Sequence, residues 1–212
     1  IREYERTGER ALSNDELREY WNGLDALPMV QRATLRFNLA IGCQRPTQLL
    51  RAELPAFDFE QNTLLLADSK GRGGSRDHLL PLPAFALEQL RPLRELNSAA
   101  PTPFSSDGRT HLSLETLSTA VRDVSRALKR KQKIPAFSQR DLRRTAETML
   151  QRLGIDREVR AHLLSHGRTK GVQGKHYERY DFLPEKRAAL ERWAEHIGRM
   201  LDPTKAAKVV NL

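Results

Sequence analysis

Cysteine, acidic residues and long apolar runs are all scarce in this sequence of 212 residues. Its one cysteine, Cys43, excludes a disulfide or a cysteine-rich zinc site within the chain, and its apolar surroundings predict a small core residue. No apolar run approaches the roughly 18 residues that cross a membrane, and no signal peptide is visible. We therefore expect a protein of a reducing, cytoplasmic compartment with no membrane partner.

The shortage of acidic residues leaves the chain strongly basic. Lysine and arginine number 36 against 27 for aspartate and glutamate, which gives a net charge of +9. Hydrophobic residues make up 39% of the chain, a share that excludes a mostly disordered protein. The positive excess favours a polyanionic partner, nucleic acid first, although a basic and merely solvated surface fits the composition about equally well.

Helix signals dominate the first fifty residues. Ser13 begins a predicted capping box, and the helix that it opens ends before Pro28. An apolar helix over about 30–41 is stopped by Gly42, and Pro46 can begin a third, short helix. The next segment changes to the two-residue period of strands, with expected strands at 57–59, 63–66 and 78–82.

The rest of the chain is predicted to be helical. Helices are expected near 84–97, 114–130, 139–153, 156–165 and 184–201. The predicted fold class is therefore mainly α with one small three-stranded antiparallel sheet, in a single domain over residues 13–201. Because the chain starts at Ile1 and not at methionine, we expect residues 1–12 to be a linker from an upstream DNA-binding domain. Residues 202–212 are expected to be a tail with a strand-like end.

Six positions stand out as candidates for chemistry. Two basic residues occupy breaks between elements, two lie at the start of one helix, and a histidine and a tyrosine lie between the last two helices. These residues are Arg45, Lys70, Arg140, Arg143, His166 and Tyr177.

The order of these positions resembles the catalytic domain of the tyrosine recombinases, or phage integrases, over nearly the whole chain. That family has an arginine after a helix, a lysine in a β-turn, a His-x-x-Arg box, a Leu-Gly-His box and then a tyrosine. Arg45, Lys70, Arg143, His166 and Tyr177 match those places in order. The ending after Tyr177 is similar to integrases of genomic islands and satellite phages.

The resemblance implies site-specific DNA recombination through a 3′-phosphotyrosine intermediate, with Tyr177 as nucleophile and no metal, ATP or other cofactor. Arg45 and Arg143 suit the phosphate oxygens, since guanidinium groups offer planar, paired donors. His166 can donate to a phosphate oxygen or assist proton transfer, and Lys70 is the expected general acid for the leaving 5′-oxygen.

Two positions depart from the family pattern. Arg140 stands where the family has histidine, which replaces an acid/base group by a permanent cation and either preserves phosphate binding or lowers activity. Ser165 replaces the glycine of Leu-Gly-His, a mild change. Tyr180, three residues after Tyr177, is a rival nucleophile on the same face if the segment is helical.

Each candidate also has an ordinary structural explanation when it is taken alone. These are a surface charge at a helix end for Arg45, a solvated turn for Lys70, a solvated helix face for Arg140, Arg143 and Arg144, a partner of the helix dipole for His166, and a half-buried aromatic for Tyr177. Only the ordered set favours function.

Further basic residues are candidates for DNA contacts beyond the scissile phosphate, with a solvated basic face as the alternative. They are Arg72 and Arg76 near Lys70; Arg122, Arg126, Lys129 and Arg130 on one helix; Arg144; and Arg168, Lys170 and Lys175 before Tyr177.

The expected partner is double-stranded DNA with attachment-type sites, and the expected location is on DNA in the cytoplasm, for a protein encoded by a bacterium or a phage. The resemblance implies a tetramer on two duplexes, whereas the isolated domain is expected to be a monomer. We expect residues 205–212 to add a strand to a partner or to pack back on the same subunit, with a frayed terminus as the alternative. Competing functions are a type IB topoisomerase, a non-catalytic DNA-binding protein with this fold, and a helical protein-interaction module.

Overall fold

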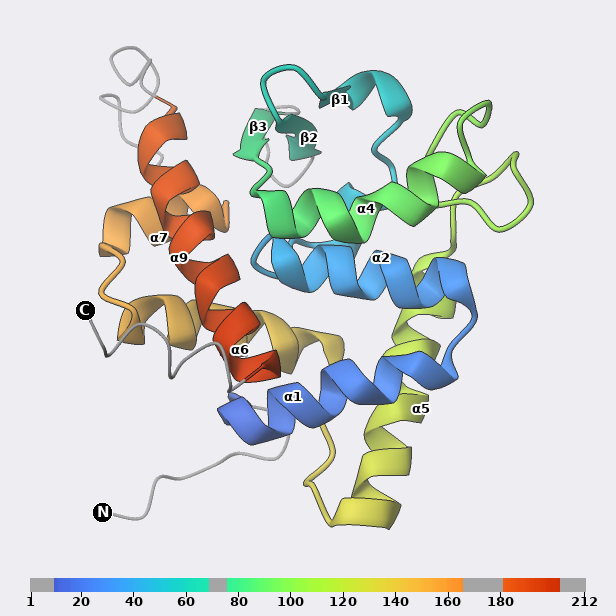
Figure 1. The fold of residues 1–212 in the computed structure, drawn as a ribbon, viewed down its shortest axis with the longest axis vertical. Coiled ribbons are helices and arrows are strands. Elements are labelled where there is room, and N and C mark those ends of the chain that lie inside the picture. Colours follow the sequence, from blue (N-terminus) through green and yellow to red (C-terminus); the bar gives the residue numbers. More distant parts are fainter. Residues whose placement is uncertain (1–9, 69–75, 166–180, 203–212) are drawn as a thin grey trace.

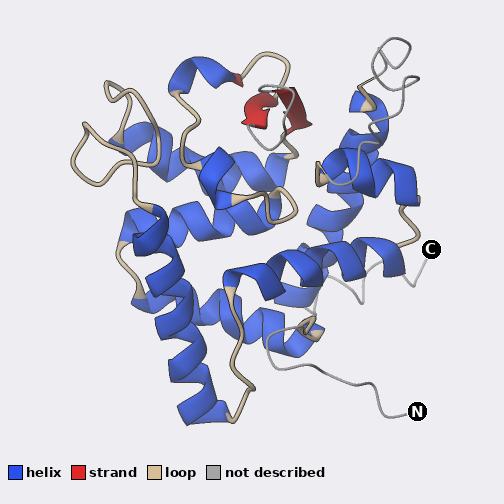
Figure 2. Cartoon of the chain, turned by 180° about the vertical axis from the view of Figure 1, so that it is seen from behind, coloured by secondary structure: helices blue, strands red, loops and turns tan. Residues whose placement is uncertain are grey.

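The computed structural model describes residues 10–68, 76–165 and 181–202, and within them the molecule is mostly helical with one small sheet (Figures 1 and 2). The predicted fold class is confirmed. The elements, in chain order, are α1 (Asn14–Gly23), η1 (Leu24–Ala26), α2 (Met29–Ala40), α3 (Pro46–Leu49), η2 (Leu54–Ala56), β1 (Phe57–Asp58), β2 (Thr63–Asp68), β3 (Arg76–Pro81), α4 (Ala84–Leu96), α5 (Leu114–Gln132), α6 (Gln139–Arg152), α7 (Arg157–Leu163) and α9 (Leu183–Leu201).

Local sequence signals explain where most helices begin. Ser13 accepts a hydrogen bond from the Glu16 amide while the Glu16 side chain bonds back, so the predicted capping box is present. Pro28 directly precedes α2, and Pro46 is the first residue of α3, as expected from its fixed φ angle. One helix contains a proline in its interior: α4 continues across Pro92.

The sheet is antiparallel in the order β1-β2-β3 and lies at one end of the molecule (Figure 2). Successive side chains on its strands point to opposite faces, as the two-residue period of a strand predicts. Leu64 and Leu80 pair across the sheet and are buried, whereas Leu65 is 43% exposed. One face of the sheet therefore joins the core.

Helix α9 ties distant parts of the chain together. The Trp193 Nε1 donates to the carbonyl of Leu39 at the end of α2, at 2.8 Å. Lys186, 3% exposed, donates through Nζ to the Leu79 carbonyl of β3 at 2.5 Å. The helix that begins just after the Tyr177 segment in the sequence is thus fixed both to α2 and to the sheet.

No helix among the described residues is both long and apolar enough to cross a membrane.

Candidate active site

Arg45 owes its place to the way α2 ends. Gly42 has a φ of +79°, and its amide donates to the Leu39 carbonyl at 3.0 Å while the Cys43 amide donates to the Asn38 carbonyl at 2.8 Å. This pair of bonds is a Schellman motif, which needs a left-handed residue and so favours glycine. The chain therefore reverses after α2 and brings Arg45 to the N-cap of α3, half-buried.

Arg143 reaches the same place from α6. Its Nη1 donates to the Cys43 carbonyl at 2.8 Å, and its Nη2 donates to the Leu164 carbonyl. Arg45 Nη2 donates to the next carbonyl, that of Ser165, at 3.2 Å. Both guanidinium groups thus meet at the end of α7, where the last carbonyls of a helix lack partners within the helix and carry partial negative charge.

A cavity of about 370 Å³ opens between α2, α3 and α6 beside these two residues. Arg45, Arg140 and Arg143 supply its positive charge. Buried amide side chains from Asn38 and Gln44 line it as well. A concave, positively charged site of this kind suits a phosphate group with some polar contacts around it.

The thiol in this cavity is not built for nucleophilic chemistry. Burial raises the pKa of Cys43 to about 12, a shift that the charge of Arg143 only partly offsets. Cys43 is 4% exposed, so the prediction of a core residue is confirmed. Burial also raises the pKa of the Tyr20 hydroxyl well above its usual value, which keeps that phenol protonated. Neither group supplies an anion near neutral pH.

Among residues 10–68, 76–165 and 181–202, no group of three or more histidine, cysteine or acidic side chains is placed to hold a metal ion.

Several solved structures are similar to the chain. The crystal structure of XerA recombinase aligns with a TM-score of 0.63 and 18% identity, covering 89% of this chain and 65% of that protein. A lambda integrase dimer bound to a COC′ core site aligns with a TM-score of 0.60 and 20% identity, covering 83% and 49%. The integrase from mycobacterium phage Brujita aligns with a TM-score of 0.64 and 16% identity, covering 92% and 65%.

The chain has the tyrosine recombinase catalytic-domain fold. The fold that the sequence resemblance implied is therefore confirmed. The chain spans less than two thirds of the length of each of these three proteins. No protein-family model and no curated protein matches the sequence.

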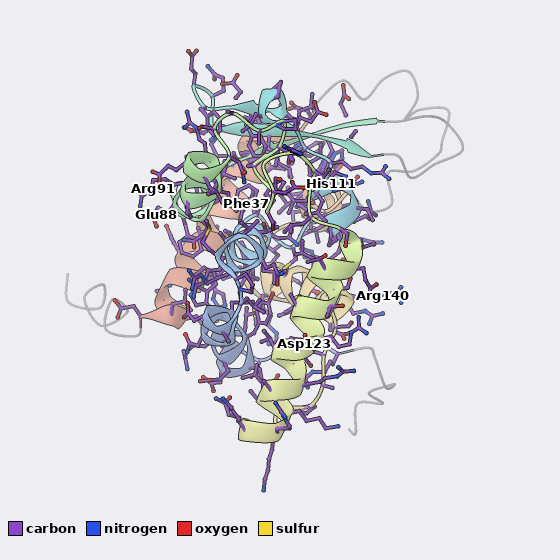
Figure 3. All side chains as sticks on the ribbon, turned by 90° about the vertical axis from the view of Figure 1, so that its right-hand side faces the viewer. Phe37, Glu88, Arg91, His111, Asp123 and Arg140 are labelled. Atoms are coloured by element: carbon purple, nitrogen blue, oxygen red, sulfur yellow. The ribbon has the colours of Figure 1, made fainter. Side chains whose placement is uncertain are left out.

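Within this recombinase fold, the two predicted arginines that flank Arg143 on α6 have different surroundings. Arg140 is exposed, lines the cavity and lies at the edge of the molecule, on the side toward which β2 and β3 extend (Figure 3). Arg144 is turned to its own helix, where its Nη1 lies 3.2 Å from a carboxylate oxygen of Asp141. Arg140, but not Arg144, is therefore part of the cavity lining.

The basic residues predicted on α5 are all exposed, and two of them are paired. Arg122 lies 3.3 Å from Glu115, and Arg126 lies 3.7 Å from Asp123, which Figure 3 labels on the outer face of α5. Lys129 and Arg130 lie in the last turn of α5, where cations stabilise the helix end. These four side chains form a surface separate from the lining of the cavity.

Several predicted site residues lie outside the described part of the chain. They are Lys70, Arg72, His166, Arg168, Lys170, Lys175, Tyr177 and its rival Tyr180, together with most of the predicted linker 1–12 and tail 202–212. The backbone of Arg76 begins β3, but its side chain is outside the description as well.

Sequence reasoning missed two buried polar residues that support the arginines. Asp141, 1% exposed, accepts from the Ser138 amide at 2.9 Å and holds Arg144, so it fixes the start of the helix that carries Arg143. The Ser-x-x-Asp spacing of Ser138 and Asp141 is a capping signal that was available in the sequence. Gln44 gave no such signal, because one of its two contacts is with a distant helix.

Proposed function

We propose that the chain is the catalytic domain of a site-specific tyrosine recombinase that cleaves and rejoins double-stranded DNA. The observation that carries this proposal is the meeting of Arg45 and Arg143 on consecutive carbonyls at the end of α7. Leu164 and Ser165, which accept these hydrogen bonds, directly precede His166 in the sequence. Two of the residues expected to act on the phosphate thus come from one junction of the fold, and a third follows that junction in the sequence.

The arginine pair supplies what phosphodiester cleavage needs without a metal. In the transition state the phosphorane carries additional negative charge on its non-bridging oxygens. Guanidinium groups meet such charge with paired, fixed donors, and their half-buried position strengthens each bond relative to water. Because the fold already holds both groups, little reorganisation is needed when the phosphate arrives.

The covalent step is assigned to residues named by the sequence. The Tyr177 hydroxyl attacks the phosphorus, the bond to the 5′-oxygen breaks, and a 3′-phosphotyrosine forms. An ordinary tyrosine has a pKa near 10, so the site must stabilise the phenolate and accept its proton. His166 accepts the Tyr177 proton and can then donate to a phosphate oxygen, and Lys70 gives a proton to the leaving 5′-oxygen. Religation reverses these transfers, and the energy of the broken bond is kept in the protein–DNA link.

Arg140 takes the role of a phosphate-binding cation in this scheme. A histidine at that place can exchange protons, whereas a guanidinium stays charged at any physiological pH. Its exposure at the cavity leaves it accessible to an incoming DNA backbone.

We further propose that the substrate is duplex DNA with an attachment-type site and that the protein acts on DNA in the cytoplasm. Similar solved structures include XerH bound to its difH substrate and a lambda integrase tetramer bound to a Holliday junction. The same proposal includes the assembly of this chain. We propose that the isolated domain is a monomer and that it forms a tetramer on DNA. Residues 1–12 are then a linker, and residues 202–212 are exchanged between subunits.

The test is covalent capture on nicked suicide duplexes with a randomised core, since the target site is unknown. The unmodified chain should yield a protein–DNA adduct that survives denaturant. Tyr177→Phe should remove the adduct completely, because phenylalanine has no nucleophile, and Tyr180→Phe should retain it. Loss in Tyr180→Phe with retention in Tyr177→Phe would transfer the nucleophile to Tyr180.

Arg140 favours one alternative, a DNA-binding protein of the same fold that does not cleave. Salt-dependent DNA binding with no adduct from the unmodified chain would support that alternative. Relaxation of supercoiled plasmid without strand exchange would instead indicate a type IB topoisomerase activity.

A further inference from the structure

Gln44, next to Arg45, is an amide sealed inside the site. Its side chain is 1% exposed, and its Nε2 donates to the Ile41 carbonyl at 2.8 Å and to the Leu163 carbonyl at 3.2 Å. The first bond closes the turn after α2, and the second crosses to the end of α7. One side chain thus joins the turn that carries Arg45 to the helix end that precedes His166.

Gln44 completes a series of three bonds at the C-terminal end of α7. The consecutive carbonyls of Leu163, Leu164 and Ser165 accept from Gln44, Arg143 and Arg45, respectively. Two of these three donors are the guanidinium groups that the proposed reaction directs at a phosphate. In that reaction both guanidinium groups also face the phosphate with their remaining donors, whereas the buried amide, within the described part of the chain, bonds only to its own turn and to the end of α7.

The amide is not arranged for stability alone. Its Oε1 is buried and has no hydrogen-bond partner among the described residues. A buried acceptor without a partner costs free energy, so an apolar side chain of the same length would recover part of what the two Nε2 bonds contribute.

We propose that Gln44 is a positioning residue that keeps the Arg45 turn and the end of α7 in register while the arginines hold the scissile phosphate. The inference rests on the proposed function, since it assigns a role within that reaction. In this role Gln44 acts through Arg45 and the α7 end and takes no part in the bond changes.

The chain offers a matched control for the removal of such an amide. Asn97, 3% exposed, donates through Nδ2 to the carbonyls of Pro103 and Ser105 at 2.8 and 2.9 Å. It follows α4 and does not line the cavity. Gln44→Met and Asn97→Leu therefore each remove two amide-to-carbonyl bonds while keeping a side chain of similar size, one at the site and one away from it.

The experiment compares these variants in the full chain by three measurements. Single-turnover adduct formation on the captured suicide duplex should slow by roughly 10- to 100-fold in Gln44→Met, the range that misplacement of a reacting group produces. The affinity for the same duplex should change by less than about threefold, because most of it comes from other phosphate contacts. Asn97→Leu should lower the melting temperature and leave the rate constant of the folded molecules unchanged.

Amide hydrogen exchange gives a readout that does not depend on catalysis. The Leu164 amide donates to the Arg160 carbonyl at 2.9 Å and reports on the end of α7. It should exchange several-fold faster in Gln44→Met and at the unmodified rate in Asn97→Leu. If Gln44→Met does not fold, Gln44→Asn, one methylene shorter, should show the same direction of change.

Equal cleavage rates in Gln44→Met and the unmodified chain would overturn the proposal, as would equal slowing in the two variants. If the unmodified chain forms no adduct, the proposed function fails. Hydrogen exchange of the Leu164 amide then tests the anchoring role of Gln44 independently of cleavage. Faster exchange in Gln44→Met would support its anchoring role, and unchanged exchange would overturn it.

Discussion

The arginines of the cavity and the basic residues of α5 carry the same charge in opposite surroundings. Arg45 and Arg143 are half-buried and donate to backbone carbonyls outside their own helices. Arg122 and Arg126 are exposed and paired with carboxylates on their own helix, at 3.3 and 3.7 Å. Exposed pairs of that kind contribute little to stability and are weakened by salt.

The two sets of cations differ in how they can act on DNA: those of the cavity are held in a fixed orientation, and those of α5 are not. A guanidinium held by carbonyls presents its remaining donors in one direction, which is what a transition state requires. An exposed cation attracts a polyanion from any direction and gives it up as salt rises. We therefore expect changes at the cavity to affect the rate of cleavage, and changes on α5 to affect the affinity for DNA.

Of the changes within these two regions, Arg143→Lys is expected to have the largest effect. Lysine retains the charge but offers one compact ammonium, which cannot replace the two Nη contacts of Arg143 and also face a phosphate. Cleavage at saturating DNA should fall by about 10²- to 10³-fold, measured as single-turnover adduct formation. Affinity for the duplex should remain within about threefold.

Arg126→Lys is the control for that change, because Arg126 makes an exposed ion pair on α5. It should leave both the cleavage rate and the affinity within about twofold. Comparable losses in Arg143→Lys and Arg126→Lys would show that the two regions do not differ in the way proposed.

A smaller effect, and one on affinity, is expected from removing the charges at the end of α5. The double variant Lys129→Gln, Arg130→Gln should weaken binding several-fold and lower the slope of log affinity against log salt by about one for each phosphate that these side chains neutralise. The cleavage rate at saturating DNA should not change. An unchanged salt slope would show that these two side chains do not contact DNA.

Local signals explain why most of the fold could be predicted. Ser13, Gly42 and Pro46 each act within a few residues, through a cap, a left-handed turn and a fixed φ, and the elements they bound are present. The alternation of β2 and β3 likewise follows from side chains on the strand itself. Predicted boundaries differ by a few residues, as at 156–165, where α7 is Arg157–Leu163.

The arrangement of the site depends on contacts that no local pattern encodes. Gln44 and Leu163 are 119 residues apart in the sequence, and Arg45 and Ser165 are 120 apart. The sequence nevertheless named the two arginines together as candidates, because the resemblance supplied an order of residues. The amide between them was not, since that order does not include it.

A small effect is expected at Arg140, which tests the comparison within a single helix. Arg140 shares α6 with Arg143 but is exposed, so its charge should act more as those of α5 do. Arg140→His restores a group that can exchange protons and removes a permanent cation. Cleavage should therefore stay within about threefold or rise, and a rise should grow as pH falls toward the usual pKa of histidine near 6.5.

Single-turnover rates from pH 6 to 8 check this, with Arg140→Gln as the control that removes the charge without adding an acid. A large loss in both variants would show that Arg140 is an oriented phosphate contact like Arg45 and Arg143. Arg140 would then belong with the cavity arginines and not with the exposed cations.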